Sequence, residues 1–296
     1  MIYLLITTVI WGFSFGLIKN NLPGVDPVFV SLCRMALSLL IFMPFLRLKK
    51  LSIRFSLKMV LIGAVQYGVM YICYISSFQY LKAYEVALFT IFTPLFVILF
   101  DGALKKRLSW FFLATTLVTI AGTAIIEYQQ LSTTSFWLGF ILVQISNLAF
   151  AIGQILYRRE FKTISGVKDV NIFGLLYFGG VISTGIAAAI FTPWANLQLS
   201  ATQIWSLVYL GIVASGVGFF LWNLGARKVN VGALAIANDL KVPVAILISL
   251  LLFGEATDLP RLIMGGVIIV AALVINELVS KRISEPSGEN LDQSIG

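Results

Sequence analysis

Ten hydrophobic stretches, each of about 20 residues, follow one another along this chain of 296 residues. They lie at about 2–18, 27–46, 57–80, 84–101, 109–127, 135–157, 170–193, 203–225, 229–253 and 261–280. A helix of that length crosses the hydrocarbon core of a bilayer, so the sequence predicts an all-α integral membrane protein with ten transmembrane helices. Only 11% of the residues are charged, which is less than half of what a soluble domain carries.

The basic residues are distributed unevenly between the two sides of the predicted membrane protein. Of the 21 Lys and Arg residues, 16 fall on the side of the two termini and the even-numbered connections, three fall on the other side, and Arg34 and Lys241 fall inside spans. The positive-inside rule therefore predicts a multi-pass protein of the cytoplasmic (inner) membrane with both termini in the cytoplasm. Short basic clusters at span ends do not form the contiguous basic face that binds nucleic acid, so no nucleic-acid partner is predicted.

Glycine and proline positions recur at a spacing of 148 or 149 residues. The matched pairs are Gly63 and Gly211, Gly68 and Gly216, and Pro94 and Pro243. Five spans in each copy invert the second copy relative to the first, so the sequence predicts two inverted five-helix repeats at 1–128 and 135–280, followed by a disordered cytoplasmic tail at 281–296. Inverted repeats are typical of secondary transporters, whose substrate site lies near the midplane where discontinuous helices meet. Pro94 and Pro243 are the predicted hinges.

Several short patterns along the chain carry a resemblance to a known family. They are Trp11-Gly12 leading to Lys19, Arg34-Met35-Ala36, Pro94, Gly211, the aromatic stretch 219–222, Arg227-Lys228, Pro243 and Gly254-Glu255. On these residues the chain, from about 2 to 280, resembles the EamA-domain permeases of the drug/metabolite transporter superfamily. The resemblance implies a ten-helix permease for small metabolites, often an amino-acid exporter, and a structural role for Arg34. The chain departs from the family pattern at Asp101-Gly102, where Gly-Glu is usual, and at Asp239 and Lys241.

The ninth span contains the densest set of polar residues. Asn238, Asp239 and Lys241 lie about 15 Å from the start of the span, near the midplane of the bilayer. A zwitterionic amino acid complements these charges, with its carboxylate on Lys241 and its ammonium on Asp239. Intramembrane charges usually have a function, but they are also tolerated as ion pairs, so Asp239 paired with Lys241 or with Arg34 is an equal alternative.

Other candidate substrate-binding residues come from four further spans. Tyr67, Tyr71, Tyr74 and Phe78 share one helical face, with Gln66 beside it, and either line a cavity or pack on a neighbouring helix. The remaining candidates are Asn147, in a polar stripe of the sixth span, and Trp11 and Trp222. For Gln154 and Asn223, in the same regions, we predict hydrogen bonds between helices.

No catalytic chemistry is indicated. Gly12 to Gly16 match G-x-S-x-G, but the chain has no His to act as the general base, and two glycines at this spacing predict a close helix contact. Neither a P-loop nor a metal-ligand pattern is present, and Cys33 and Cys73 lie in apolar segments, so we expect no cofactor, no metal and transport driven by gradients.

Three functions agree with this sequence. The first is a secondary transporter that exports amino acids or similar zwitterionic metabolites by alternating access, with protons as an optional coupling ion. The second is a transporter of another charged metabolite or drug, such as an organic anion, a nucleotide-like compound or a cationic amine. The third is a non-transporting membrane scaffold, which has no need for charges at mid-membrane. For all three functions we expect the protein to lie in a lipid bilayer, as a monomer or a weak homo-oligomer.

Overall fold

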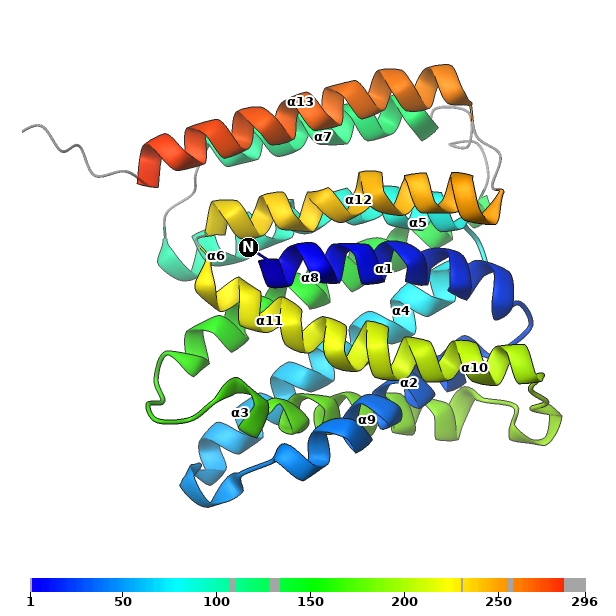
Figure 1. Cartoon of the computed structure of the whole chain (residues 1–296), viewed down its shortest axis with the longest axis vertical. Coiled ribbons are helices and arrows are strands. Elements are labelled where there is room, and N and C mark those ends of the chain that lie inside the picture. The colour runs from blue at the N-terminus through cyan, green and yellow to red at the C-terminus, as the bar shows by residue number, and fades with distance from the viewer. Residues whose placement is uncertain (1, 107–109, 128–133, 230, 255–257, 285–296) are drawn as a thin grey trace, which may run out of the picture.

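The computed structural model describes residues 2–106, 110–127, 134–229, 231–254 and 258–284. All regular structure in these residues is helical, and it forms ten rods that run roughly parallel or antiparallel to one another (Figure 1). Six rods are single helices: α1 (Ile2–Asn21), α2 (Pro27–Phe42), α7 (Trp110–Glu127), α8 (Thr134–Phe161), α9 (Phe173–Phe191) and α12 (Val231–Phe253). A seventh is α13 (Leu259–Ser284), and the other three are α3 (Ile53–Gly63) with α4 (Met70–Ser77), α5 (Ala83–Phe89) with α6 (Thr93–Lys105), and α10 (Ala201–Tyr209) with α11 (Gly218–Lys228).

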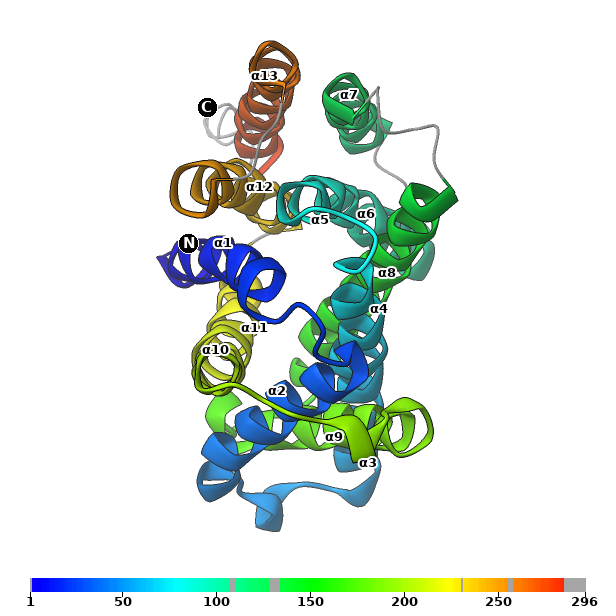
Figure 2. The same cartoon turned by 90° about the vertical axis from the view of Figure 1, so that its right-hand side faces the viewer.

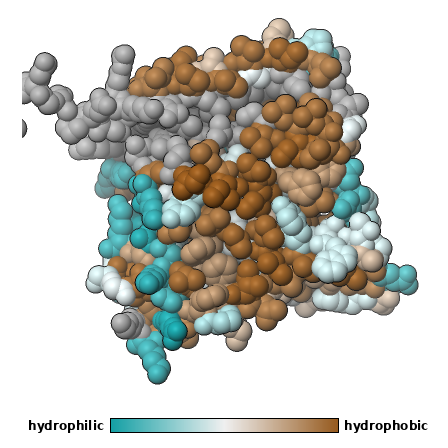
Figure 3. Space-filling view, in the orientation of Figure 1, coloured by the Kyte–Doolittle hydropathy of each residue, from teal (hydrophilic) through white to brown (hydrophobic). Residues whose placement is uncertain are grey.

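The surface has the distribution of polarity that a bilayer requires. Seven of the described rods are long and apolar enough to cross a membrane, and shorter apolar helical stretches lie at Val244–Phe253 and Leu259–Ala272. Hydrophobic side chains form a band across the middle of the face in Figure 3, with hydrophilic side chains at both ends of the helices. The prediction of an all-α, multi-pass membrane protein is therefore confirmed.

The first and last helices meet the surface at the same end of the bundle, because α1 begins and α13 ends there (Figure 1). α13 reaches Ser284, so the first residues of the predicted tail are helical, and residues 285–296 lie outside the described residues. α7 and α13 pack on each other as an outer pair beside α12 (Figure 2). α1 lies between α12 and α11, and α2 packs against α9.

Three rods are interrupted near their middles. A π-helical segment, Ala64–Val69, joins α3 to α4, and a second, Leu210–Val217, joins α10 to α11. A 3-10 turn, Thr90–Phe92, joins α5 to α6, and Pro94 lies in the first turn of α6, where its missing N–H removes no helical hydrogen bond. Such interruptions free backbone carbonyls inside the bundle and are common at functional sites.

Glycines allow the closest helix crossings. A Cβ at Gly63 would lie 1.9 Å from the carbonyl oxygen of Leu176, so α3 and α9 approach each other backbone to backbone. A Cβ at Gly16 would lie 2.1 Å from the ring of Phe253, and Gly12 also faces α12. The predicted close helix contact at Gly12 and Gly16 is therefore confirmed, and its partner is α12.

Candidate functional site

A small cavity of about 60 Å³ lies at the centre of the bundle, next to the helix interruptions. It has aromatic walls, several hydroxyl and amide groups, and one cationic side chain. Its lining residues are Trp11, Ser14 and Phe15 of α1, Arg34 of α2, Met70, Tyr71 and Tyr74 of α4, Thr90 and Thr93 at the α5–α6 break, Ser146, Asn147 and Phe150 of α8, and Phe219 of α11. This volume is far below the roughly 300–1,000 Å³ of small-molecule sites, so the cavity is closed to a metabolite in this structure.

Arg34 is the charged group of this cavity. Its side chain is buried, its Nε donates a hydrogen bond to Ser215 Oγ at 2.9 Å, and its guanidinium lies 4.4 Å from the ring centroid of Tyr71. Its Nη1 is buried and has no hydrogen-bond partner, and no carboxylate among the described side chains lies within 4.0 Å of it. Among the described side chains, the buried charge is therefore balanced only by neutral groups, which leaves a donor for an anion.

The aromatic wall is positioned by the π-helical segment at Leu210–Val217. Trp11 Nε1 donates to the carbonyl oxygen of Ala214, within this segment, at 2.8 Å. The Trp11 ring then lies 4.9 Å from each of the rings of Phe219 and Trp222, measured between centroids. These rings offer an apolar surface to a flat ligand group.

Asn147 of α8 stabilises the broken fourth rod. Its Nδ2 donates to the carbonyl oxygen of Phe89, at the end of α5, at 2.9 Å, and Thr93 Oγ1 donates to its Oδ1 at 3.1 Å. The side chain therefore spans the α5–α6 break that Pro94 allows, and it also lines the cavity. Movement of α8 relative to this break would change the shape of the cavity.

A second polar cluster lies behind the cavity wall. Gln66 Nε2 donates to Asn223 Oδ1 at 3.3 Å, Asn223 Nδ2 donates to Tyr67 OH, and Trp222 Nε1 donates to Gln154 Oε1 at 3.2 Å. All five side chains are fully buried. The predicted hydrogen bonds between helices at Gln154 and Asn223 are therefore confirmed.

The candidate binding residues are divided between these two places. Trp11, Tyr71 and Asn147 line the cavity, whereas Tyr67, Gln66 and Trp222 lie in the cluster behind it. Asn238 is buried and donates to the carbonyl oxygen of Leu234 on its own helix at 2.9 Å. Asp239, Lys241 and Pro243 belong to α12, and their side chains lie outside the described residues.

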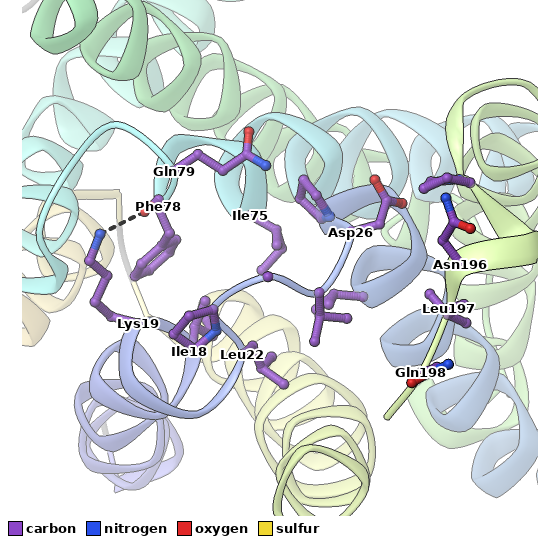
Figure 4. A pocket seen from close by; sticks show the side chains of 16 residues that line it. Ile18, Lys19, Leu22, Asp26, Ile75, Phe78, Gln79, Asn196, Leu197 and Gln198 are labelled. Carbon is purple, nitrogen blue, oxygen red and sulfur yellow. Dashed lines mark hydrogen bonds between the residues drawn. The ribbon is translucent and has the colours of Figure 1, made fainter. Parts of the chain in front are cut away.

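A larger vestibule of about 670 Å³ opens at the end of the bundle where α1 ends and α2 begins (Figure 4). Lys19 Nζ donates to the carbonyl oxygens of Phe78 at 2.8 Å and Leu81 at 2.9 Å. Asp26 Oδ1 accepts hydrogen bonds from Phe29 N at 2.8 Å and from Thr192 Oγ1 at 2.7 Å. Lys19 therefore holds the backbone that follows α4, and Asp26 connects the start of α2 to the end of α9. These segments form the rim of the vestibule.

Three aromatic rings separate the vestibule from the cavity. Phe15 and Tyr74 line the cavity and Phe78 lines the vestibule. The ring centroids of Phe15 and Tyr74 lie 5.8 Å apart, and those of Tyr74 and Phe78 lie 5.2 Å apart. The four residues of the predicted aromatic face in the third span therefore lie in three different places. Tyr67 packs behind the cavity wall, Tyr71 and Tyr74 line the cavity, and Phe78 lines the vestibule.

Known proteins resemble this chain over nearly its whole length. The model of the EamA-like transporter family matches residues 1–128 and 137–277. The chain belongs to the EamA-like transporter family. It is 40% identical to the probable biotin transporter of Pseudomonas aeruginosa over 285 residues, covering 96% of this chain and 99% of that protein. It is 37% identical to the biotin transporter of Escherichia coli K12, covering 98% of this chain and 97% of that protein.

Two further proteins resemble this chain at lower sequence identity. The probable terminal-alkyne amino-acid exporter of Streptantibioticus cattleyicolor is 25% identical, covering 96% of this chain and 95% of that protein. A solved crystal structure superimposes with a TM-score of 0.73 at 16% identity, covering 95% of this chain and 98% of the other, which shows a shared fold. This EamA-like protein is therefore a transporter of a small metabolite and not an enzyme.

Proposed function

We propose that this EamA-like transporter carries biotin, or a compound with the same ureido ring and carboxylate, into the cell. The observation that carries the proposal is Arg34, a buried guanidinium on the cavity wall with one nitrogen that has no hydrogen-bond partner and no carboxylate neighbour among the described side chains. A substrate with one negative charge and no ammonium group complements such a site.

Each part of biotin has a matching group in the cavity. The carboxylate suits the planar guanidinium of Arg34, which can donate two parallel hydrogen bonds. The ureido ring has two N–H donors, for which the hydroxyl oxygen of Ser14 and Oδ1 of Asn147 are neutral acceptors. The apolar remainder of the bicyclic ring fits against the aromatic side chains of Trp11 and Phe219.

We further propose a direction of transport and a transport cycle. The vestibule of about 670 Å³ lies on the side that the distribution of basic residues predicts to be outside, where a substrate for uptake would enter. In the cycle we propose, the inverted repeats at 1–128 and 135–280 rock against each other in the inner membrane, so that the closed cavity opens first outward and then to the cytoplasm. Protons are the coupling ion that we would test first.

The direct test is uptake of radiolabelled biotin by proteoliposomes that contain the purified protein. We expect uptake above that of protein-free liposomes, and we expect unlabelled biotin to compete for it. A Lys49→Gln variant, altered at an exposed position outside the cavity and the vestibule, is the matched control and should transport normally. Absence of uptake under proton gradients of either sign, from protein that remains folded, would refute the proposal.

Export of a zwitterionic amino acid is the second candidate. It is favoured by Asp239 and Lys241, two opposite charges in the middle of α12, and by the similarity to an amino-acid exporter. The same proteoliposomes distinguish the candidates, because preloaded unlabelled amino acids should drive counterflow of labelled amino acids only if this second function is correct.

A further inference from the structure

A basic pocket of about 300 Å³ lies at the end of the bundle opposite the vestibule, between α6 and the end of α8. Its charged lining residues are Asp101 and Lys105 on α6, Arg158 and Arg159 on α8, and Lys162 just after α8. This pocket shares no residue with the central cavity or the vestibule. The proposed substrate pathway therefore does not account for it.

The positive charge of this pocket is not balanced by its neighbours. Asp101 is already paired with Lys105 at 2.7 Å, and the adjacent Glu160 is paired with Lys58, also at 2.7 Å. Among the described side chains, no carboxylate lies within 4.0 Å of Arg158, Arg159 or Lys162. Among the described residues, four basic side chains therefore share one recess with a single carboxylate, that of Asp101, and the recess has a net positive charge.

Arg158 gives the pocket a defined geometry. Its Nη2 donates to the carbonyl oxygen of Val229, in the link between α11 and α12, at 2.9 Å. Its Nη1 is buried and has no hydrogen-bond partner among the described residues. A guanidinium that is held at one nitrogen and unsatisfied at another is suited to donate to the oxygen of a phosphate group.

We infer that this pocket binds the phosphate group of an anionic lipid headgroup, such as that of phosphatidylglycerol. The pocket lies at the polar ends of α6 and α8, where the lipid phosphates of a surrounding bilayer are found, and on the side predicted to face the cytoplasm. Basic pockets between transmembrane helices on this side bind such headgroups. A bound phosphate would connect α6, α8 and, through Arg158, the α11–α12 link, which belong to both halves of the chain.

Thermal unfolding of the purified full-length protein in nonionic detergent tests this inference without any substrate. Added phosphatidylglycerol should raise Tm in a saturable way, because a ligand that binds only the folded protein stabilises it. Phosphatidylcholine of the same chain length should not. The double variant Arg159→Gln/Lys162→Gln, which removes two exposed charges, should weaken the apparent affinity by roughly 30-fold.

Two further measurements test whether binding is specific to this pocket and whether the ligand is a lipid. The control variant Lys49→Gln/Arg54→Gln removes two exposed basic residues outside the pocket and should bind phosphatidylglycerol like the wild type. If inorganic phosphate raises Tm as much as phosphatidylglycerol does, the ligand of this phosphate site is a soluble phosphate and not a lipid headgroup. Equal stabilisation by phosphatidylcholine, or undiminished affinity in the Arg159→Gln/Lys162→Gln variant, would overturn the inference.

Discussion

Replacing Arg34 by Met removes the guanidinium from the cavity wall and keeps a long, unbranched side chain in its place. In the wild type, the hydrogen bond to Ser215 and the contact with the Tyr71 ring together contribute about 3–5 kcal/mol. Against this, a buried cation without an ion-pair partner costs several kcal/mol of lost hydration. Because the two contributions are of similar size, we expect the free energy of unfolding to change by less than about 2 kcal/mol in either direction.

The effect on the substrate should be much larger and should depend on its charge. Loss of one partner of a buried, hydrogen-bonded charge pair costs about 2–5 kcal/mol, which weakens biotin binding by roughly 30- to 4,000-fold. Biotinol, in which an alcohol replaces the carboxylate, does not form that pair. Its affinity for Arg34→Met should therefore stay within about threefold of its affinity for the wild type, which is a difference of less than 1 kcal/mol.

Binding of both ligands to the purified protein, measured by calorimetry beside Tm, separates the explanations. Arg54→Met is the matched control, because Arg54 is exposed and lies outside the cavity. Biotin affinity in Arg34→Met equal to that of the wild type would refute the role of Arg34 as a carboxylate anchor. A large fall in Tm with loss of both ligands would instead support the structural role that the family resemblance implies for this residue.

Three other predictions test the packing, the topology and the charges of α12. Gly63→Ala should lower Tm through about 1–3 kcal/mol of overpacking, since its Cβ would lie 1.9 Å from a carbonyl oxygen of α9; unchanged Tm would contradict the close crossing. A reporter fused after Lys106 should report the cytoplasm and one after Asn196 the outside, and a cytoplasmic signal at Asn196 would contradict the ten-span topology. If Asp239 and Lys241 form only a structural pair, either neutral single variant should lose about 3–5 kcal/mol of stability, and Asp239→Leu/Lys241→Met should recover both fold and transport; a folded but inactive double variant would assign them to the substrate.

The membrane-spanning character was predictable because hydropathy is a local property of the sequence. The helix boundaries follow the apolar stretches closely, although the third rod begins at Ile53 and the tail helix continues to Ser284. Trp11, Tyr71 and Asn147 could be selected because each is a polar or aromatic residue near the middle of a span; all three line the cavity, and their binding of substrate stays a prediction. The predicted repeat boundaries, the orientation and the roles of Asp239 and Lys241 stay predictions.

The position of Arg34 on the cavity wall was not predictable, because hydropathy does not give the rotation of a helix about its axis. Thr90, Thr93 and Ser146, which also line the cavity, were missed for the same reason. A signal was nevertheless present at Thr90 and Thr93, two hydroxyl residues that lie four residues and one residue before Pro94, at a point where the helix must release a backbone group.

The two predicted prolines also differ in a way that only tertiary contacts explain. The rod with Pro94 is divided by a 3-10 turn, whereas the backbone of α12 is helical from Val231 to Phe253, across Pro243. At the first break, Asn147 of a neighbouring helix accepts from Thr93 and donates to the carbonyl oxygen of Phe89, at the end of α5. A proline permits an interruption, but a partner for the released backbone group stabilises it inside a membrane.

The two cavities and the rings between them define what must move during transport. The vestibule, at about 670 Å³, lies within the roughly 300–1,000 Å³ range of small-molecule sites, but the cavity that contains Arg34, at about 60 Å³, does not. A substrate that reaches Arg34 from the vestibule must therefore displace the ring contacts of Phe15, Tyr74 and Phe78. Lys19 of α1 binds the carbonyl oxygens at the end of α4, so separation of α1 from α4 requires both hydrogen bonds of its ammonium to break. In the uptake that we propose, the first step is then a movement of α4 away from α1, and the π-helical segment at Ala64–Val69, directly before α4, is the place where the rod would bend to allow it.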